Sequence, residues 1–241
     1  MLTKEKISEV KKINSKDWLR LTALGLLFYT FTQGTQFVGL SLLPAVTVSL
    51  LLNFSPIIVA VMGIFLLSEN PSKLQWLGAS LFIIGILAYF YPVNLSESKT
   101  LGIVVMAIGV FSNAFSSILG RSVNRGGNLH PLIVTVVSMG IGSVVMLIIG
   151  LAVQGLPYLS LTNILFLFWL AVVNTALAFT LWNLSLRTLT AMESSIINGT
   201  MLIQIAILAW IFIGEPITLK EGAGMLIAAC GALIVQIKRG N

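Results

Sequence analysis

Charge is scarce in this sequence. Only 9% of its 241 residues are Asp, Glu, Lys or Arg, whereas 57% are hydrophobic. A typical soluble domain carries about a quarter charged residues. The composition therefore excludes an ordinary soluble protein and indicates a chain whose solvent is lipid.

Reactive side chains are scarce as well. The chain has one cysteine, Cys230, and one histidine, His130, and no Cys, His or carboxylate cluster surrounds either of them in the sequence. An intrachain disulfide is excluded and no metal site is expected. No nucleophile with a paired base, Walker sequence or dinucleotide fingerprint is visible, so the sequence predicts no enzyme, no cofactor and no direct use of ATP.

Long apolar runs, in contrast, are abundant. Each is about 20 residues long, which is the length of a helix that crosses the hydrocarbon layer. Because backbone groups in lipid must be paired internally and these runs do not alternate, they predict helices rather than barrel strands. The sequence predicts an all-α membrane protein, a polytopic bundle of eight transmembrane helices at residues 18–41, 44–67, 74–91, 101–119, 131–154, 161–184, 191–213 and 219–237.

The basic residues predict an orientation in the lipid bilayer. If the amino terminus is cytoplasmic, all but two of the 14 Lys and Arg residues fall in inside segments, and only Lys99 and Lys220 fall in outside loops. Lys and Arg near helix ends mark the cytoplasmic side. The net charge of +6 then reflects topology and not a nucleic-acid partner. We predict an inner-membrane protein with both termini cytoplasmic.

The chain also contains an internal repeat. A shift of 146 residues places Glu69 on Glu215 and Gly78 on Gly224, and a two-residue gap extends the similarity from 36–42 to 180–186. The first three helices thus correspond to the last three. Because the copies are five helices apart, an odd number, they are expected to have opposite orientations, as in the inverted repeats of transporters.

This repeat predicts a 3 + 5 organisation. Residues 1–17 form a cytoplasmic basic lead, 18–92 an incomplete first repeat of three helices, 100–237 a second repeat of five helices, and 238–241 a cytoplasmic tail. Nothing precedes the first helix to match those at 101–119 and 131–154. Either the true start lies upstream of Met1, or the chain has eight helices by nature.

The two copies resemble a known family. "LSLLPAVTVSLLLNFSPIIVAVMGIFLLSENPSKLQWLGASLFIIGILA" (40–88) and "LWNLSLRTLTAMESSIINGTMLIQIAILAWIFIGEPITLKEGAGMLIAACGALI" (181–234) resemble the EamA domains of the drug/metabolite transporter superfamily. "GVFSNAFSSILGR" resembles the opening helix of that domain, which commonly ends in an arginine such as Arg121. The resemblance covers residues 18–237 and implies ten helices in the family pattern, of which this sequence lacks the first two. It also implies a transporter, with export the commoner direction.

Polar residues inside the predicted helices are the candidate substrate-binding or coupling residues, because lipid makes them costly. Glu193, Thr200 and Gln204 fall on one stripe of the seventh helix, because Thr200 and Gln204 each lie within about 20° of Glu193 around its axis. Glu193 has two interpretations: a carboxylate that binds a cation or relays a proton, or a helix cap, since Thr190 and Glu193 have capping-box spacing.

Six further candidates lie on other helices: Gln33, Gln36, Asn53, Asn113, Asn174 and Trp182. Asn53 precedes Pro56, which frees a backbone carbonyl and is predicted to kink the second helix. The alternative for each of these residues is a hydrogen bond that joins two helices. The paired glycines of the third and eighth helices predict close helix packing.

The sequence as a whole predicts a secondary transporter of a small metabolite, such as an amino acid or a related amphipathic compound, that works by alternating access. The alternative is a truncated or subunit form that does not transport unless a partner supplies the missing helices. A second copy of the chain and such complementing helices are the candidate protein partners. The substrate itself and the energy coupling stay open.

Overall fold

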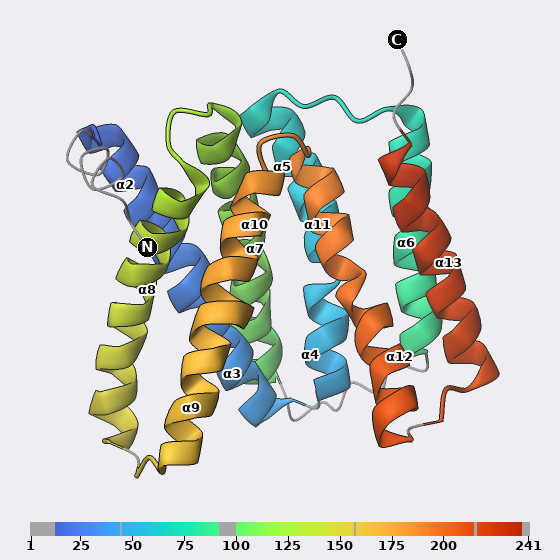
Figure 1. Cartoon of the computed structure of the whole chain (residues 1–241). Helices are drawn as coiled ribbons and strands as arrows, with labels where there is room; N and C mark the ends of the chain where they lie inside the picture. Colours follow the sequence, from blue (N-terminus) through green and yellow to red (C-terminus); the bar gives the residue numbers. More distant parts are fainter. Residues whose placement is uncertain (1–12, 44, 92–99, 157, 215, 238–241) are drawn as a thin grey trace. The chain divides into compact units, whose positions relative to one another are not determined.

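Helices make up the regular structure of the chain. The computed structural model describes residues 13–43, 45–91, 100–156, 158–214 and 216–237, and no strand occurs in these ranges (Figure 1). The elements, two of them π-helical (η), are α2 (Ser15–Leu24), η1 (Gly25–Thr32), α3 (Gln33–Leu42), α4 (Ala45–Leu52), α5 (Ser55–Leu67), α6 (Lys73–Phe90), α7 (Thr100–Arg125), α8 (Pro131–Gln154), α9 (Leu161–Trp169), η3 (Leu170–Leu177), α10 (Ala178–Ser185), α11 (Ala191–Gly199), α12 (Met201–Ile213) and α13 (Leu219–Gln236).

Seven helical runs of the described chain are long and apolar enough to cross a membrane. They correspond to the second to eighth predicted spans, and the fold is that of a polytopic helical membrane protein. The first predicted span, 18–41, is helical through α2, η1 and α3. It is not among the seven, because three threonines and two glutamines fall between positions 30 and 36. The count of eight stays a prediction.

The helices pack as two compact units, each described here by itself. The first unit comprises residues 1–34 and 119–189, and the second comprises residues 35–118 and 190–241. These units are defined by packing and not by sequence similarity, so the repeat boundaries predicted from the sequence stay a prediction.

In the first unit, η1 lies directly against α8. A Cβ built on Gly142 would lie 2.5 Å from the carbonyl oxygen of Gly25, and a Cβ on Gly25 would meet the carbonyl oxygen of Ser138. Only glycine permits this approach. Thr30 donates its hydroxyl to the carbonyl of Gly142 at 3.3 Å, so a hydrogen bond accompanies the close contact.

In the second unit, the offset of 146 residues recurs in the helix bounds. α5 and α12 begin and end at positions that differ by 146, and so do α6 and α13. Both α6 and α13 begin with a capping box, formed by Ser72 with Gln75 and by Thr218 with Glu221, at positions that again differ by 146. Equivalent residues therefore start equivalent helices.

α6 and α13 lie side by side and antiparallel (Figure 1). A Cβ on Gly78 would lie 2.7 Å from the carbonyl oxygen of Gly231, and a Cβ on Gly224 would lie 2.8 Å from that of Gly85. Gly78 is the repeat equivalent of Gly224 and Gly85 that of Gly231, so each contact is repeated with the two helices exchanged. Such reciprocal contacts are those of a two-fold axis. The glycines act in close packing, as the sequence predicted; the inverted orientation of the complete copies stays a prediction.

Candidate functional site

The predicted site residues divide between the two units. Gln36, Asn53, Asn113, Glu193, Thr200 and Gln204 belong to the second unit, whereas Gln33, Asn174 and Trp182 belong to the first. The candidate site lies in the second unit, where side chains from several helices meet.

Glu193 forms the capping box that its spacing predicted. Its Oε2 accepts the N–H of Thr190 at 2.9 Å, and its own N–H donates to the Thr190 hydroxyl at 3.2 Å. The side chain is only 4% exposed, and its Oε1 also accepts a hydrogen bond of 3.2 Å from Nε2 of Gln75 on α6. Glu193 thus joins two helices and caps one of them.

A second carboxylate reaches the same helix start. Glu69, which follows α5, accepts the N–H of Ala191 through Oε2 at 2.9 Å. The chain reaches this position through Ser68, which ends α5 with a positive φ of 52°. Glu69 therefore caps α11, a helix whose first residue lies 122 residues further on. The repeat equivalent, Glu215, lies outside the described residues.

The second predicted span is interrupted at Asn53. α4 ends at Leu52, and α5 begins at Ser55 with Pro56 in its first turn. Pro56 has no N–H to give to the carbonyl of Leu52, four residues earlier. The N–H of Asn53 and that of Phe54 donate within the turn instead, to carbonyls of α4. The second predicted span is thus interrupted beside Pro56, where the sequence predicted a kink.

The seventh predicted span is interrupted at the equivalent place. α11 ends at Gly199 and α12 begins at Met201, with Thr200 between them. Gly199 and Thr200 are the repeat equivalents of Asn53 and Phe54. The predicted stripe of Glu193, Thr200 and Gln204 therefore crosses a break and is not the face of one continuous helix; Glu193 is buried, Thr200 half-buried and Gln204 exposed.

The two breaks meet. A Cβ built on Gly199 would lie 3.3 Å from Oδ1 of Asn53 and 2.6 Å from Cζ of Phe82 on α6. Asn53 is 8% exposed and donates Nδ2 to the carbonyl of Ser49 at 2.8 Å. Its Oδ1 is buried without a hydrogen-bond partner. The sequence selected Asn53, but nothing local in the sequence indicated that it faces Gly199.

Asn113 fits the helix-joining interpretation. Its Nδ2 donates to Oγ of Ser55 at 3.1 Å, which links α7 to the first turn of α5. The hydroxyls of Ser116 and Ser117 both donate to the Asn113 carbonyl on their own helix. Gln36 is half-buried.

The first unit contains a buried polar network that the sequence prediction missed. Nδ2 of Asn124 donates to Oδ1 of Asn183 at 2.7 Å, and Nδ2 of Asn183 donates to Oγ1 of Thr135 at 3.0 Å. Three helices, α7, α8 and α10, are joined in this way. The available signal in the sequence was Asn183, a polar residue beside Trp182 in an otherwise apolar run. Trp182 and Gln33 are half-buried and Asn174 is exposed.

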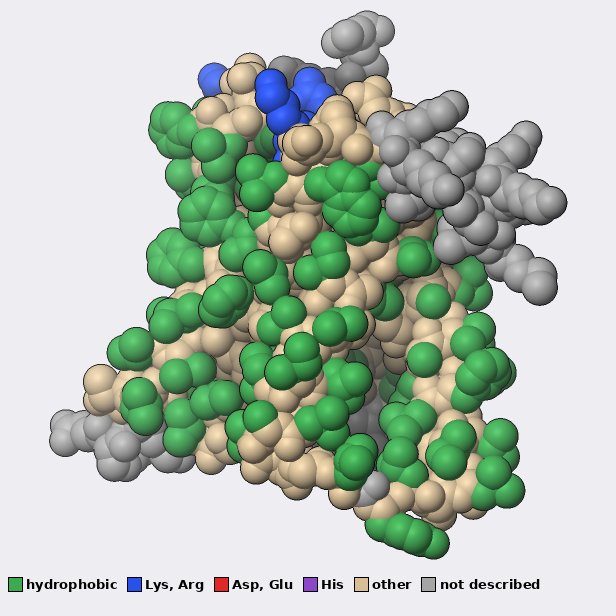
Figure 2. All heavy atoms as spheres, turned by 90° about the vertical axis from the view of Figure 1, so that its left-hand side faces the viewer, with side chains coloured by type: hydrophobic (Ala, Val, Ile, Leu, Met, Phe, Trp, Pro, Cys, Tyr) green, Lys and Arg blue, Asp and Glu red, His purple; other side chains and the backbone are tan. Residues whose placement is uncertain are grey.

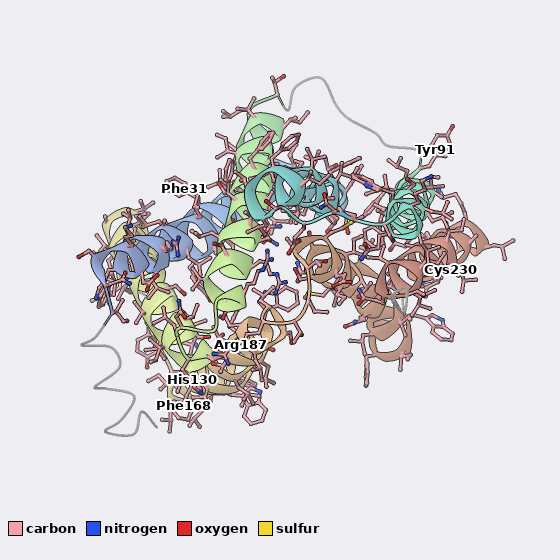
Figure 3. The ribbon with its side chains drawn as sticks, turned by 90° about the horizontal axis from the view of Figure 1, so that it is seen from above. Phe31, Tyr91, His130, Phe168, Arg187 and Cys230 are labelled. Atoms are coloured by element: carbon pink, nitrogen blue, oxygen red, sulfur yellow. The ribbon has the colours of Figure 1, made fainter. Side chains whose placement is uncertain are left out.

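Two arginines of the first unit bind backbone carbonyls near this network. Nη1 of Arg121 donates to the carbonyl of Leu186 at 2.7 Å, and Nη2 of Arg187 donates to that of Leu129 at 2.8 Å. Arg187 and His130, which follows Leu129, lie close together in Figure 3. The His130 ring accepts the N–H of Leu132 at 3.2 Å through Nδ1 and so caps α8.

Neither the histidine nor the cysteine belongs to a reactive cluster in the described part of the chain. No group of three or more His, Cys, Asp or Glu side chains that could hold a metal ion occurs in those residues. Cys230 is exposed on α13 (Figure 3).

Known proteins resemble this chain along nearly its whole length. The sequence profile described as "EamA-like transporter family" matches residues 3–91 and 100–237. The chain belongs to the EamA-like transporter family. It is therefore a multi-pass membrane transporter and not an enzyme.

Individual relatives agree with the family. "Uncharacterized transporter YyaM" of Bacillus subtilis is 25% identical over 98% of this chain and 79% of its own length. "Uncharacterized transporter YvbV" of the same organism is 27% identical over 96% and 76%, and "Protein PecM" of Dickeya dadantii is 24% identical over 94% and 76%. A crystal structure superposes with a TM-score of 0.77 over 93% of this chain and 77% of its own, at 14% identity, which shows a shared fold.

Proposed function

We propose that this EamA-family protein is a secondary transporter that exports a small metabolite, such as an amino acid or a related amphipathic compound, by alternating access. The observation that carries the proposal is the meeting of two interrupted membrane helices at repeat-equivalent positions, Asn53 and Gly199. Interrupted helices at a repeat interface are where transporters bind substrates and coupling ions.

An inequality between equivalent helices supports alternating access. In the second unit α5 packs against α11 and has a buried face, in which Val59 is 0% and Ala60 2% exposed. Ile205 of α12, the equivalent of Val59, is 59% exposed. We infer that α5 and α11 close one end of the unit, and that transport opens this contact and closes the equivalent one between α4 and α12.

The start of α11 is the proposed closing contact. Gly63 of α5 lies against it, since a Cβ on Gly63 would be 3.9 Å from the Cβ of Ala191 and 3.5 Å from Oε2 of Glu69. Glu69 and Glu193 both bind backbone N–H groups there, and Gln75 ties Glu193 to α6. In the proposed mechanism Glu193 is the coupling residue, because protonation would weaken these hydrogen bonds and release α11.

We also propose an inner-membrane location with both termini in the cytoplasm. Figure 2 shows Lys and Arg side chains gathered at one end of a face that is otherwise largely apolar. Helices of the first unit begin or end with basic residues at Lys16, Arg125 and Arg187. Under the positive-inside rule this end is cytoplasmic.

Reconstitution in proteoliposomes tests the function. We expect the wild type to exchange a labelled mixture of glycine, leucine and phenylalanine, and a pH gradient to drive that exchange. Glu193→Gln keeps the capping box, since Gln75 serves the same role in α6, but removes the titrating group. Loss of gradient-driven flux in this variant with an unchanged melting temperature is the expected result; equal flux in both proteins excludes Glu193 as the coupling residue.

A further inference from the structure

The contact between α6 and α13 places a local two-fold axis near the middle of both helices. A Cβ on Gly85 would meet the backbone nitrogen of Ala228, and a Cβ on Gly231 would meet that of Phe82. Phe82 and Ala228 are repeat equivalents, so a two-fold rotation that exchanges the two helices also exchanges these two residues. The axis of the repeat passes beside them.

The two helix breaks lie at the same axis. The ring of Phe82 and Oδ1 of Asn53 both lie beside the position that a Cβ on Gly199 would take. Equivalent residues compete for the same space at a two-fold axis, so one of each pair must be small. The first copy supplies the large residues, Phe82 and Asn53, and the second copy supplies Ala228 and Gly199. The axis is therefore filled by unlike residues, and only one of the two copies brings a polar side chain to it.

The polar group at the axis is an acceptor without a partner. The Ser49 carbonyl can only accept, so it fixes the amide of Asn53 with Nδ2 toward Ser49 and Oδ1 toward Gly199. A buried acceptor left without a donor destabilises the folded chain, because it has lost its hydrogen bonds to water. A leucine at this position would fill a similar volume without that cost. The presence of asparagine is therefore explained if a hydrogen-bond donor from outside the second unit binds Oδ1.

The surroundings select the chemistry of this donor. The N–H groups of Asn53, Phe54 and Ile57 all donate within the turn, and Pro56 has none, so the break offers acceptors. α4 and α11 end at the two breaks and α5 and α12 begin there, so the helix dipoles at the breaks oppose one another and the acceptor itself decides the chemistry. The described basic side chains of the second unit, Lys73 and Lys220, stand at the outer ends of α6 and α13. A carboxylate would find no cation of this unit at the axis.

We propose that Oδ1 of Asn53 accepts a hydrogen bond from the ammonium group of the transported metabolite, which makes the substrate class amine-bearing compounds. The assignment rests on the proposed function, because the donor must enter from outside the unit. Gly199 serves it by placing no side chain of its own beside Oδ1.

Binding to the purified full chain in detergent tests the assignment by calorimetry. The ligands are the amides of glycine, leucine and phenylalanine, which keep the ammonium, and the N-acetyl forms of the same amino acids, which lack it. We expect at least one amide to bind the wild type at least tenfold more tightly than its N-acetyl counterpart. Asn53→Leu is expected to lose this preference, whereas Asn163→Leu, an exposed asparagine at the start of α9, keeps it.

Three results overturn the assignment: no binding of any amide to the wild type, equal binding of amide and N-acetyl forms, or unchanged amide binding by Asn53→Leu. A second measurement needs no ligand. If Asn53 served only the fold, its removal would lower the melting temperature; we expect Asn53→Leu to raise it by about 2–4 °C, because the unpaired acceptor is removed. A lowered melting temperature also contradicts the proposal.

Flux separates this assignment from the proposed function. Binding that depends on Asn53 in a protein that moves no labelled amino acid across vesicles refutes the proposed transport of amino acids and leaves the ligand assignment standing. Flux that Asn53→Leu carries as well as the wild type refutes the ligand assignment and leaves transport standing.

Discussion

α5 and α12 are the same element of the repeat, yet their surroundings differ. They have equal length and bounds that differ by 146 residues. α5 buries Val59 and Ala60, whereas no side chain described in α12 is buried. α6 and α13, in contrast, make equal contributions to one reciprocal contact. The comparison separates a symmetric part of the second unit, the α6–α13 pair, from an unsymmetric part, for which a second arrangement related by the two-fold axis is available.

The symmetric pair should be the most sensitive to substitution. Gly85→Leu and Gly231→Leu each place a side chain against the backbone of the facing helix, and we expect each to destabilise by about 3 kcal/mol, at the upper end for overpacking. The two losses should be equal because the positions are equivalent. Gly150→Leu on α8 is the control, since a Cβ there meets nothing within 4 Å. Thermal unfolding in detergent measures all three; unequal losses at positions 85 and 231 would break the symmetry.

The two acidic capping boxes should differ in strength. Glu193→Ala removes a buried cap and the hydrogen bond from Gln75, and we expect a loss of about 2 kcal/mol. Glu221→Ala removes a cap at the start of α13 that is more exposed, at a cost of about 1 kcal/mol or less. Thermal unfolding in the same detergent compares the two variants. A larger loss of stability for Glu221→Ala would mean that the buried hydrogen bonds of Glu193 do not stabilise the start of α11 more than an exposed cap does.

The smallest expected change in stability comes from substitutions on the equivalent faces of α5 and α12. Val59→Ala removes packed atoms from α5 and should cost about 1 kcal/mol. Ile205→Ala, at the equivalent place on α12, removes atoms that are 59% exposed and should change the stability by less than about 0.5 kcal/mol. The melting temperatures of the two variants measure the difference. Equal losses would show that α12 is packed in the protein as α5 is.

Features local in sequence were predictable, and features that join distant segments were not. The repeat offset, the break near Pro56 and the capping box of Glu193 all follow from spacings of ten residues or fewer, or from direct comparison of the two copies. The hydrogen bond from Ala191 to Glu69 and the contact of Gly199 with Asn53 depend on how helices far apart in the sequence pack. A single sequence carries no record of those pairings, and for the same reason the Asn124–Asn183–Thr135 network was missed.

The central claim is that the contact between α5 and α11 opens during transport, and a disulfide tests it most directly. The Cβ positions of residues 63 and 191 are 3.9 Å apart, which suits a disulfide. In a Cys230→Ser background, Gly63→Cys with Ala191→Cys should crosslink on oxidation, as mass spectrometry of fragments would verify. We predict that the oxidised protein exchanges no labelled glycine, leucine or phenylalanine across vesicles and that reduction restores the exchange. Equal flux before and after reduction of a verified crosslink would contradict the account.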